Sequence, residues 1–184
     1  MLKFKYETDR MYLRILDEGV YKEVLEFYQN NLGSFEVSEP IDPESFSEEF
    51  FRDILRYEHQ MILKSELIRY WAIPKAEPGR ICGTVSFRDI NRGNFQCCTL
   101  GYKVDNDYRG MGYATEMVSF GVELMEKEVK LHRIEATVLP DNEPSIRLLE
   151  KLNFKREGYL REKIQLQGVW RDHYFYARIN ESNE

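Results

Sequence analysis

The sequence has few cysteines and no long apolar run, and these scarcities narrow the class of protein. Its 184 residues contain only 3 Cys, an odd number without the spacing of a metal site or a disulfide framework: Cys82, Cys97 and Cys98. No apolar stretch approaches the roughly 18–20 residues that span a bilayer, and the first residues lack the apolar core of a signal peptide. We therefore expect a cytoplasmic protein with reduced thiols, no metal and no membrane contact.

An excess of positive charge is also absent. The chain has 26 Lys and Arg against 32 Asp and Glu, which gives a formal net charge of −6. Without a basic run, direct binding to nucleic acid is not expected, although a basic protein substrate is not excluded. The length fits one domain, residues 1–184, with a substantial core.

The hydrophobic pattern predicts an α+β protein. Alternating or aromatic-rich segments predict strands at 8–16, 68–73, 80–90, 94–104, 132–139, 154–166 and 169–179. Periodic segments predict helices at 18–31, from Ser45 or Ser47 to about 66, at 112–129 and at 144–152. This order places one strand–helix–strand crossover at the centre of the sheet, and it should be right-handed.

The segment 101–116, GYKVDNDYRGMGYATE, carries the clearest chemical signal. A strand ends near Val104, and Arg109, Gly110 and Gly112 lie in the turn that leads into the next helix. The first amides of a helix lack intrahelical partners and the helix dipole is positive there, which favours an anion. The loop thus predicts a pyrophosphate site, although a glycine-rich turn that binds nothing explains the loop alone equally well. Neither the Walker pattern nor the dinucleotide Gly-x-Gly-x-x-Gly pattern is present.

The loop does not stand alone. Arg109-x-x-Gly112-x-Ala114, between a strand and a helix, resembles the acyl-CoA loop of the GNAT superfamily of N-acetyltransferases. Residues 8–14, 132–145 and 154–168 resemble, in order and spacing, the ribosomal-protein N-terminal acetyltransferase branch of RimJ/RimL type. This resemblance covers nearly the whole chain. It implies a GNAT-type fold, with a mixed, mostly antiparallel central sheet flanked by about four helices.

The resemblance also implies where acetyl-CoA binds. The pyrophosphate would meet the glycine-rich turn, the pantetheine would follow the preceding strand, and the start of the last helix would face the pantetheine and sulfur. The residues so implied are Arg109, Gly110, Met111, Gly112, Tyr113 and Ala114 for the pyrophosphate, Tyr102, Lys103 and Val104 for the pantetheine, and Asn142 and Ser145 for the third group. Read without the resemblance, Asn142 is a helix N-cap before Pro144.

The implied reaction is direct attack of a neutral primary amine on the thioester. Deprotonating a Lys ε-amine at pH 7 costs roughly 4–5 kcal/mol, but an α-amine costs only about 1 kcal/mol. This difference favours the N-terminal α-amine of a protein, or another amine of low pKa, as acceptor. A small amine (polyamine, amino acid or antibiotic) and a non-catalytic CoA-binding module are the alternatives.

One expected catalytic acid is missing. Many members of the superfamily carry a Tyr four residues after the position of Ser145, where this chain has Leu149. Ser145 is left as the hydroxyl that would stabilise the departing thiolate.

The general base of the RimJ/RimL-type branch is also missing from its usual position. The branch's Glu would correspond to Ile164, and Glu162 lies two residues earlier, on the same strand face if no bulge intervenes. Glu135, on the central strand, is a slightly better candidate, and a water relay is another; each carboxylate could equally be an ordinary ion-paired residue. His173 is a further candidate base or a packing residue.

The acceptor itself is not specified by sequence. Residues 36–53 contain seven acidic residues and one basic residue, Arg52. They form either a negative rim that concentrates a cationic amine or basic peptide, or a solvated loop and helix face. The aromatic final hairpin could pair edges between two subunits, so a homodimer is an open expectation.

Overall fold

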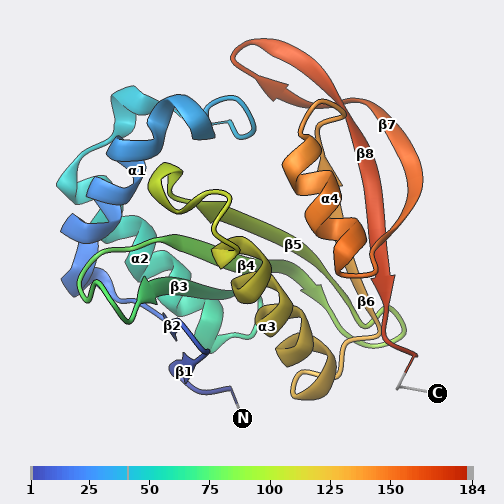
Figure 1. The fold of residues 1–184 in the computed structure, drawn as a ribbon, viewed down its shortest axis with the longest axis horizontal. Helices are drawn as coiled ribbons and strands as arrows, with labels where there is room; N and C mark the ends of the chain where they lie inside the picture. Colours follow the sequence, from blue (N-terminus) through green and yellow to red (C-terminus); the bar gives the residue numbers. More distant parts are fainter. Residues whose placement is uncertain (1, 41, 182–184) are drawn as a thin grey trace.

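The computed structural model describes residues 2–40 and 42–181 and contains one mixed sheet with helices on both faces (Figure 1). The strand order is β1-β2-β3-β4-β5-β6-β8-β7, and only β5 and β6 pair in parallel. The strands are β1 (Lys5–Glu7), β2 (Met11–Arg14), β3 (Ile68–Pro74), β4 (Gly83–Asn91), β5 (Cys97–Val104), β6 (Arg133–Val138), β7 (Lys155–Leu166) and β8 (Val169–Ile179). The helices are α1 (Tyr21–Phe35), α2 (Glu48–Leu63), α3 (Tyr113–Lys127) and α4 (Glu143–Lys151). The predicted α+β architecture is confirmed.

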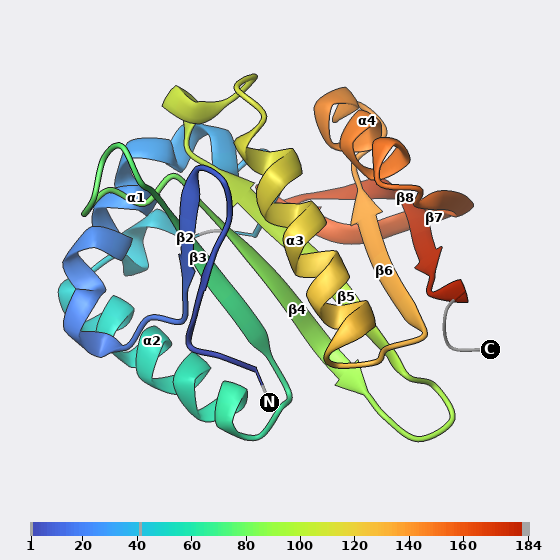
Figure 2. The same ribbon diagram turned by 60° about the horizontal axis from the view of Figure 1, so that its bottom comes forward.

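Alternation along the central strands sends side chains to two separate cores. Tyr70 of β3 and Val85 of β4 pack with Val118 of α3. The next residue of β3, Trp71, packs with α1 and α2, for example on Phe27. Successive residues of a strand point to opposite faces, so the sheet has an α3 face and an α1–α2 face (Figure 2).

The sheet opens between β5 and β6. The two strands are joined by the crossover through α3, and they pair only from Cys97–Thr99 to Arg133–Glu135. The remaining residues of β5, from Leu100 to Val104, pair with β4 but not with β6. Figure 1 shows the strands separating toward α4. A gap therefore runs through the centre of the sheet.

Two elements near the N-terminus differ from the sequence prediction. Within the predicted strand 8–16, β2 covers Met11–Arg14 and Thr8 lies in the turn after β1, a strand that the sequence did not predict. Helix α1 continues through Gly33 to Phe35 instead of ending at Asn31. Asn31 is buried, donates to Phe27 O and accepts from the amide of Asn106, so its side chain serves a tertiary contact rather than a helix end.

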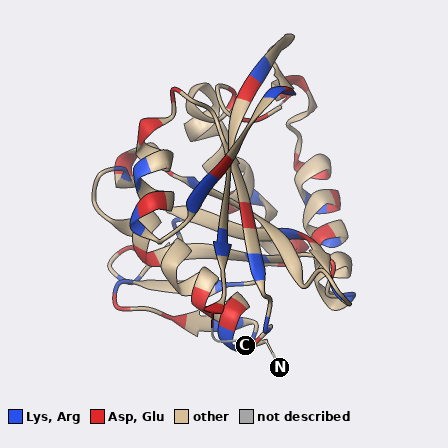
Figure 3. Cartoon of the chain, turned by 90° about the vertical axis from the view of Figure 1, so that its right-hand side faces the viewer, with Lys and Arg blue, Asp and Glu red and all other residues tan. Residues whose placement is uncertain are grey.

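The outer hairpin is rich in charge. β7 lies at the sheet edge, and Lys, Arg, Asp and Glu are interspersed along β7 and β8 (Figure 3). Charged side chains on an edge strand oppose pairing with another sheet, and the homodimer stays a prediction. Across the part of the chain that the structure describes, no helix has the length and apolarity needed to cross a membrane.

Candidate active site

The turn before α3 forms an uncapped helix N-terminus. Gly110 has φ 73° and Gly112 has φ 82°, a left-handed conformation that strains any residue with a Cβ. No side chain of residues 2–40 or 42–181 caps the helix, and the amide of Glu116 is the one that bonds back to Gly112 O. Arg109 is exposed beside this turn. Free amides at the start of α3 and an exposed arginine just before it are the groups that an anion site requires.

The β1–β2 turn holds this loop in place. The Glu116 carboxylate accepts from the Thr8 hydroxyl at 2.6 Å and from the Arg10 guanidinium at 2.7 Å, and Arg10 also donates to Met111 O at 2.8 Å. The Arg10 guanidinium lies 4.4 Å from the centre of the Tyr113 ring. Burial raises the pKa of Glu116, but the hydrogen bonds from Thr8 and Arg10 outweigh it and the pKa lies below its ordinary value. Sequence reasoning placed Thr8 and Arg10 in a family-like stretch but gave them no role.

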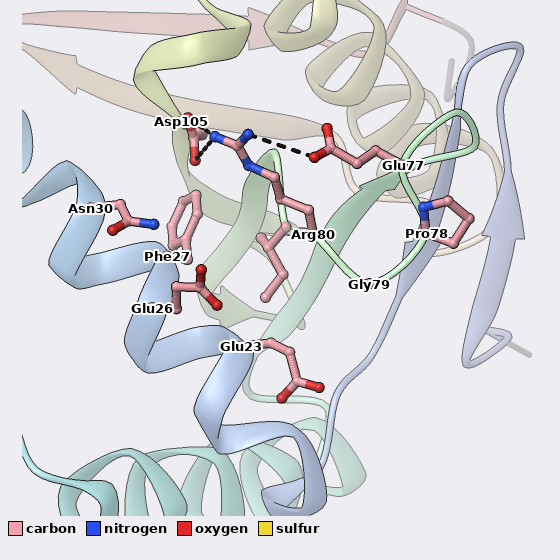
Figure 4. Close-up of a pocket in the computed structure, with 10 residues that line it drawn as sticks. Glu23, Glu26, Phe27, Asn30, Glu77, Pro78, Gly79, Arg80 and Asp105 are labelled. Atoms are coloured by element: carbon pink, nitrogen blue, oxygen red, sulfur yellow. Dashed lines mark hydrogen bonds and ion pairs between the residues drawn. The ribbon is translucent and has the colours of Figure 1, made fainter.

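A second anchor lies at the end of β5. The buried Asp105 carboxylate accepts from the Asp107 amide at 2.9 Å and from Arg80 at 3.3 Å. Figure 4 shows Arg80 between Asp105 and Glu77, at a cavity of about 280 Å³ that is also lined by acidic residues of α1. Arg80 pairs with the acidic groups around it. We therefore interpret this cluster of ion pairs as a support for the loop, and not the cavity beside it as a binding site.

A cavity of about 290 Å³ occupies the gap between β5 and β6 and has walls on both faces of the sheet. On the α3 face its walls come from β5, the β6–α4 segment and α4: Leu100, Tyr102, Val138, Leu139, Asn142, Ser145 and Leu149. On the α1–α2 face they include Glu39, Arg69, Thr84, Ser86, Arg88 and Lys103. A ligand entering from one face can therefore meet a ligand entering from the other.

Two hydroxyl groups meet on the α3 side of this cavity. The Tyr102 hydroxyl donates to Ser145 Oγ at 2.9 Å. Burial raises the pKa of Tyr102, which the hydrogen bond to Ser145 opposes only in part. Asn142 Oδ1 accepts from the Ser145 amide at 3.3 Å, so Asn142 is an N-cap of α4 that also lines the cavity. Leu149 is buried there and offers no hydroxyl.

The two predicted carboxylate bases do not line the cavity. Glu135 accepts from Arg133 Nε at 2.6 Å. Glu162 is exposed and has φ 47°. It lies at a bulge between Leu160 and Ile164, so the expectation that Glu162 shares a strand face with Ile164, which required a strand without a bulge, is not met. Its amide donates to Asp172 Oδ1 at 2.7 Å.

His173 does line the cavity. It is 3% exposed, and its Nδ1 lies 3.1 Å from the carbonyl oxygen of Arg171. A proton on Nδ1 would donate to that carbonyl and leave Nε2 as an acceptor. Burial lowers the pKa of His173 below 6.5, so the neutral form predominates at pH 7.

The α1–α2 side of the cavity is rich in cations, so of the two interpretations of residues 36–53 the negative rim is not seen in its walls. Of the seven acidic residues in 36–53, Glu39 is the one in its walls, and it pairs with Lys103 Nζ at 2.6 Å. Arg69 lies beside Glu58 of α2, with Nε 3.3 Å from Oε1. Sequence reasoning missed Arg69 and Arg88; the signal was their position among polar residues that alternate with apolar ones along β3 and β4. In the described ranges, no group of three or more His, Cys, Asp or Glu could hold a metal ion.

Comparison with known proteins gives concordant relatives. The family model described as "Acetyltransferase (GNAT) domain" matches residues 10–155. A probable N-acetyltransferase of Bacillus subtilis, YjcK, is 40% identical over 127 residues, which cover 69% of this chain and 70% of that protein. The [ribosomal protein uS5]-alanine N-acetyltransferase of Escherichia coli is 27% identical over 95% of this chain and 90% of its own. The crystal structure of the ribosomal-protein-S5-alanine acetyltransferase of Vibrio fischeri superposes with a TM-score of 0.93 at 26% identity, covering 99% of this chain and 100% of that one.

Proposed function

The chain belongs to the GNAT acetyltransferase family and is an acetyl-CoA-dependent N-acetyltransferase, and from this premise we propose that its acceptor is the N-terminal α-amine of a protein. The observation that carries the proposal is the cavity through the sheet, which joins a hydroxyl pair on one face to an acceptor space on the other. The E. coli and V. fischeri relatives described above, which are named as alanine acetyltransferases of a ribosomal protein, support the choice of acceptor.

The residues present fit the co-substrate. Acetyl-CoA supplies an activated acetyl group on a thioester. The amides of Gly110–Ala114, together with Arg109, would hold its pyrophosphate at the uncapped start of α3. The segment Tyr102–Val104 of β5 pairs with β4 but not with β6, and its edge toward β6 would offer backbone groups to the pantetheine arm.

Ser145 and Tyr102 together would manage the leaving group. The amine attacks the thioester carbonyl, the new C–N bond forms and the C–S bond breaks, which leaves a thiolate. A hydroxyl that donates to the sulfur lowers the energy of this charge as it develops. Because Tyr102 donates to Ser145, Ser145 is free to donate its own proton onward, and Tyr102 can reprotonate it. Tyr102 thereby supplies, from β5, the hydroxyl that Leu149 of α4 lacks.

His173 is the proposed acceptor of the amine proton. It lines the cavity, and its pKa below 6.5 keeps it neutral at physiological pH. An α-amine loses its proton near neutral pH, so a weak base or a water chain to His173 is sufficient. Glu135 and Glu162, which lie outside the cavity walls, are the weaker candidates.

A screen of acceptors tests the proposal. Purified protein is incubated with acetyl-CoA and a thiol reagent, with peptides bearing free N-termini in one set and polyamines and amino acids in another. We expect thiol release with peptides and mass spectrometry that places the acetyl group on the α-amine. Thiol release with small amines but not with peptides would show that the acceptor is a small amine and not a protein N-terminus. Absence of release with every acceptor, despite measurable CoA affinity, would favour a binding module.

The proposed compartment is the cytoplasm. All three cysteines are free, and burial raises the pKa of Cys82 and of Cys98 to about 12. Reduced, unreactive thiols are typical of intracellular proteins.

A further inference from the structure

We propose that the acceptor carries a carboxylate close to its amine, and that Arg69 and Arg88 bind this carboxylate on the α1–α2 side of the cavity. This inference rests on the proposed function and adds the chemical class of the substrate. On a protein acceptor, the carboxylate belongs to an Asp or Glu side chain beside the N-terminus; a free amino acid offers the same group from another source.

The strand register places the two arginines on one face. Arg69 of β3 lies opposite Ser86 of β4, and Arg88 is two residues beyond Ser86. A diagonal pair of this kind has backbones roughly 7–8 Å apart, within reach of long side chains. Both Ser86 and Arg88 lie beside Gly101 of β5, where a Cβ would be tight against Ser86 Oγ at 3.2 Å and in ordinary contact with Arg88 Nη2 at 3.7 Å. Both arginines line the cavity.

The donors of Arg69 are only partly satisfied. Its side chain is 13% exposed, and its buried Nε lies 3.3 Å from Glu58 Oε1 in an ion pair that lacks the geometry of a hydrogen bond. A buried donor in poor geometry is costly, and a carboxylate bound at the cavity end of the guanidinium would add acceptors to that of Glu58.

The neighbouring charges leave the space cationic. Lys103 is matched by Glu39 at 2.6 Å, and Arg69 lies near Glu58 at 3.3 Å. Arg88 is exposed at the cavity wall and takes part in no ion pair within residues 2–40 and 42–181. Guanidinium groups recognise carboxylates through paired hydrogen bonds, and the Ser86 hydroxyl, whose bond to Gly101 O is long at 3.4 Å, can contribute another donor.

The cations also suit the chemistry. An enzyme that transfers an acetyl group to an amine must bind that amine uncharged. Positive neighbours disfavour the ammonium form and favour the neutral amine. A carboxylate on the acceptor would offset the repulsion on binding and leave the amine ready to attack.

The test compares hexapeptides that differ only at the second residue: Ala-Glu, Ala-Gln and Ala-Lys at the N-terminus. We expect kcat/KM for the Glu peptide to exceed that for the Gln peptide at least tenfold, with the Lys peptide lowest. Arg88→Gln should reduce the Glu/Gln ratio to below threefold, because the Glu peptide loses more rate than the Gln peptide does. Arg14→Gln, which removes an exposed Arg from β2, is the matched control and should keep the full ratio. Equal rates for the Glu and Gln peptides, or a ratio that survives Arg88→Gln, would overturn the proposal.

Free amino acids and their amides form the second arm. If peptides are not acetylated but amino acids are, with a preference over the amides that Arg88→Gln removes, the carboxylate site stands and the protein acceptor fails. If no acceptor is acetylated, calorimetry measures how tightly the N-acetylated Glu and Gln peptides bind to the CoA-loaded protein, and this comparison tests the carboxylate site. The same tenfold preference, lost in Arg88→Gln, supports the site, and equal or absent binding refutes it.

Discussion

At the scale of single residues, the hydroxyl pair of Tyr102 and Ser145 has the most direct part in the proposed chemistry. Ser145→Ala removes the donor to the sulfur, so kcat should fall about 10²-fold while the KM for acetyl-CoA changes less than threefold. Steady-state kinetics with a peptide acceptor measure both. Equal losses in turnover and in cofactor affinity would identify Ser145 as a merely structural hydroxyl.

Tyr102→Phe separates the hydroxyl from the ring. The ring packs against the α3 core and stays in the variant, so the fold should be unchanged while kcat falls at least tenfold. The matched control is Tyr57→Phe, at an exposed position of α2, which should leave kcat unaltered. Unaltered turnover in Tyr102→Phe would show that water reprotonates the thiolate without it.

The pH dependence of kcat/KM reports on His173. Burial lowers its pKa below 6.5, so His173 loses its basic form only as the pH falls through that lower value. We expect the contribution of His173 to kcat/KM to stay constant above pH 6.5 and to fall only as the pH passes through this lowered pKa. His173→Gln should remove this acid limb and reduce the rate about 10²-fold. His132→Gln, at an exposed position before β6, should retain the limb; a limb that persists in His173→Gln would assign the base to another group.

At the scale of elements, the β1–β2 turn orients the start of α3 through Glu116. Glu116→Gln keeps the shape but weakens the bonds from Thr8 and Arg10, so the Kd for CoA should rise several-fold with kcat nearly unchanged. Calorimetry and kinetics measure the two effects. Glu123→Gln, on the exposed side of the same helix and paired with Lys127, should change neither. A fall in kcat with unaltered affinity would place Glu116 in the chemistry instead.

Glu116 also gives the fold an acid sensitivity. Its pKa is lower in the folded chain than the ordinary 4.5, so the stabilisation is fully present above pH 4.5 and is lost as the pH falls through the folded-state pKa. Urea unfolding at pH 7 should show Glu116→Gln less stable than the parent. Below pH 4 the difference between the two should shrink. A difference that is the same at both pH values would exclude an electrostatic origin.

The sequence predicted those elements whose signals are local. Gly110, Gly112 and the polar turn mark the start of α3 because positive φ requires glycine there. The bulge at Glu162 has no such signal, because non-glycine residues occupy it and its geometry follows from pairing with β8. The cationic wall of the cavity could not be predicted from local signals either, because the register of β3 and β4 is what brings Arg69 and Arg88 to one place on the sheet.

At the scale of the whole molecule, the sheet is two parts joined by a short parallel contact. β5 and β6 pair over three residues on each strand, and the crossover through α3 supplies the covalent link. The α3 face is covered by one core that includes residues from both parts, such as Phe87 of β4 and Ala136 of β6. Packing on the α3 face therefore joins the two parts of the sheet, while the cavity between β5 and β6 also has walls on the α1–α2 face, the side proposed for the acceptor.

Filling this gap should stabilise the molecule as a whole. A ligand that binds only the folded state at 100 times its Kd adds about 2.7 kcal/mol, which for a domain of this size corresponds to roughly 5–10 °C in Tm. We expect CoA to raise the Tm by that amount, and hydrogen exchange to slow in residues 100–104, 109–114 and 136–145. Arg109→Glu places a negative charge against the pyrophosphate and should abolish both effects without changing the Tm of the unliganded protein, since Arg109 is exposed. Protection confined to other segments, or a full Tm shift in Arg109→Glu, would move the nucleotide away from the turn before α3.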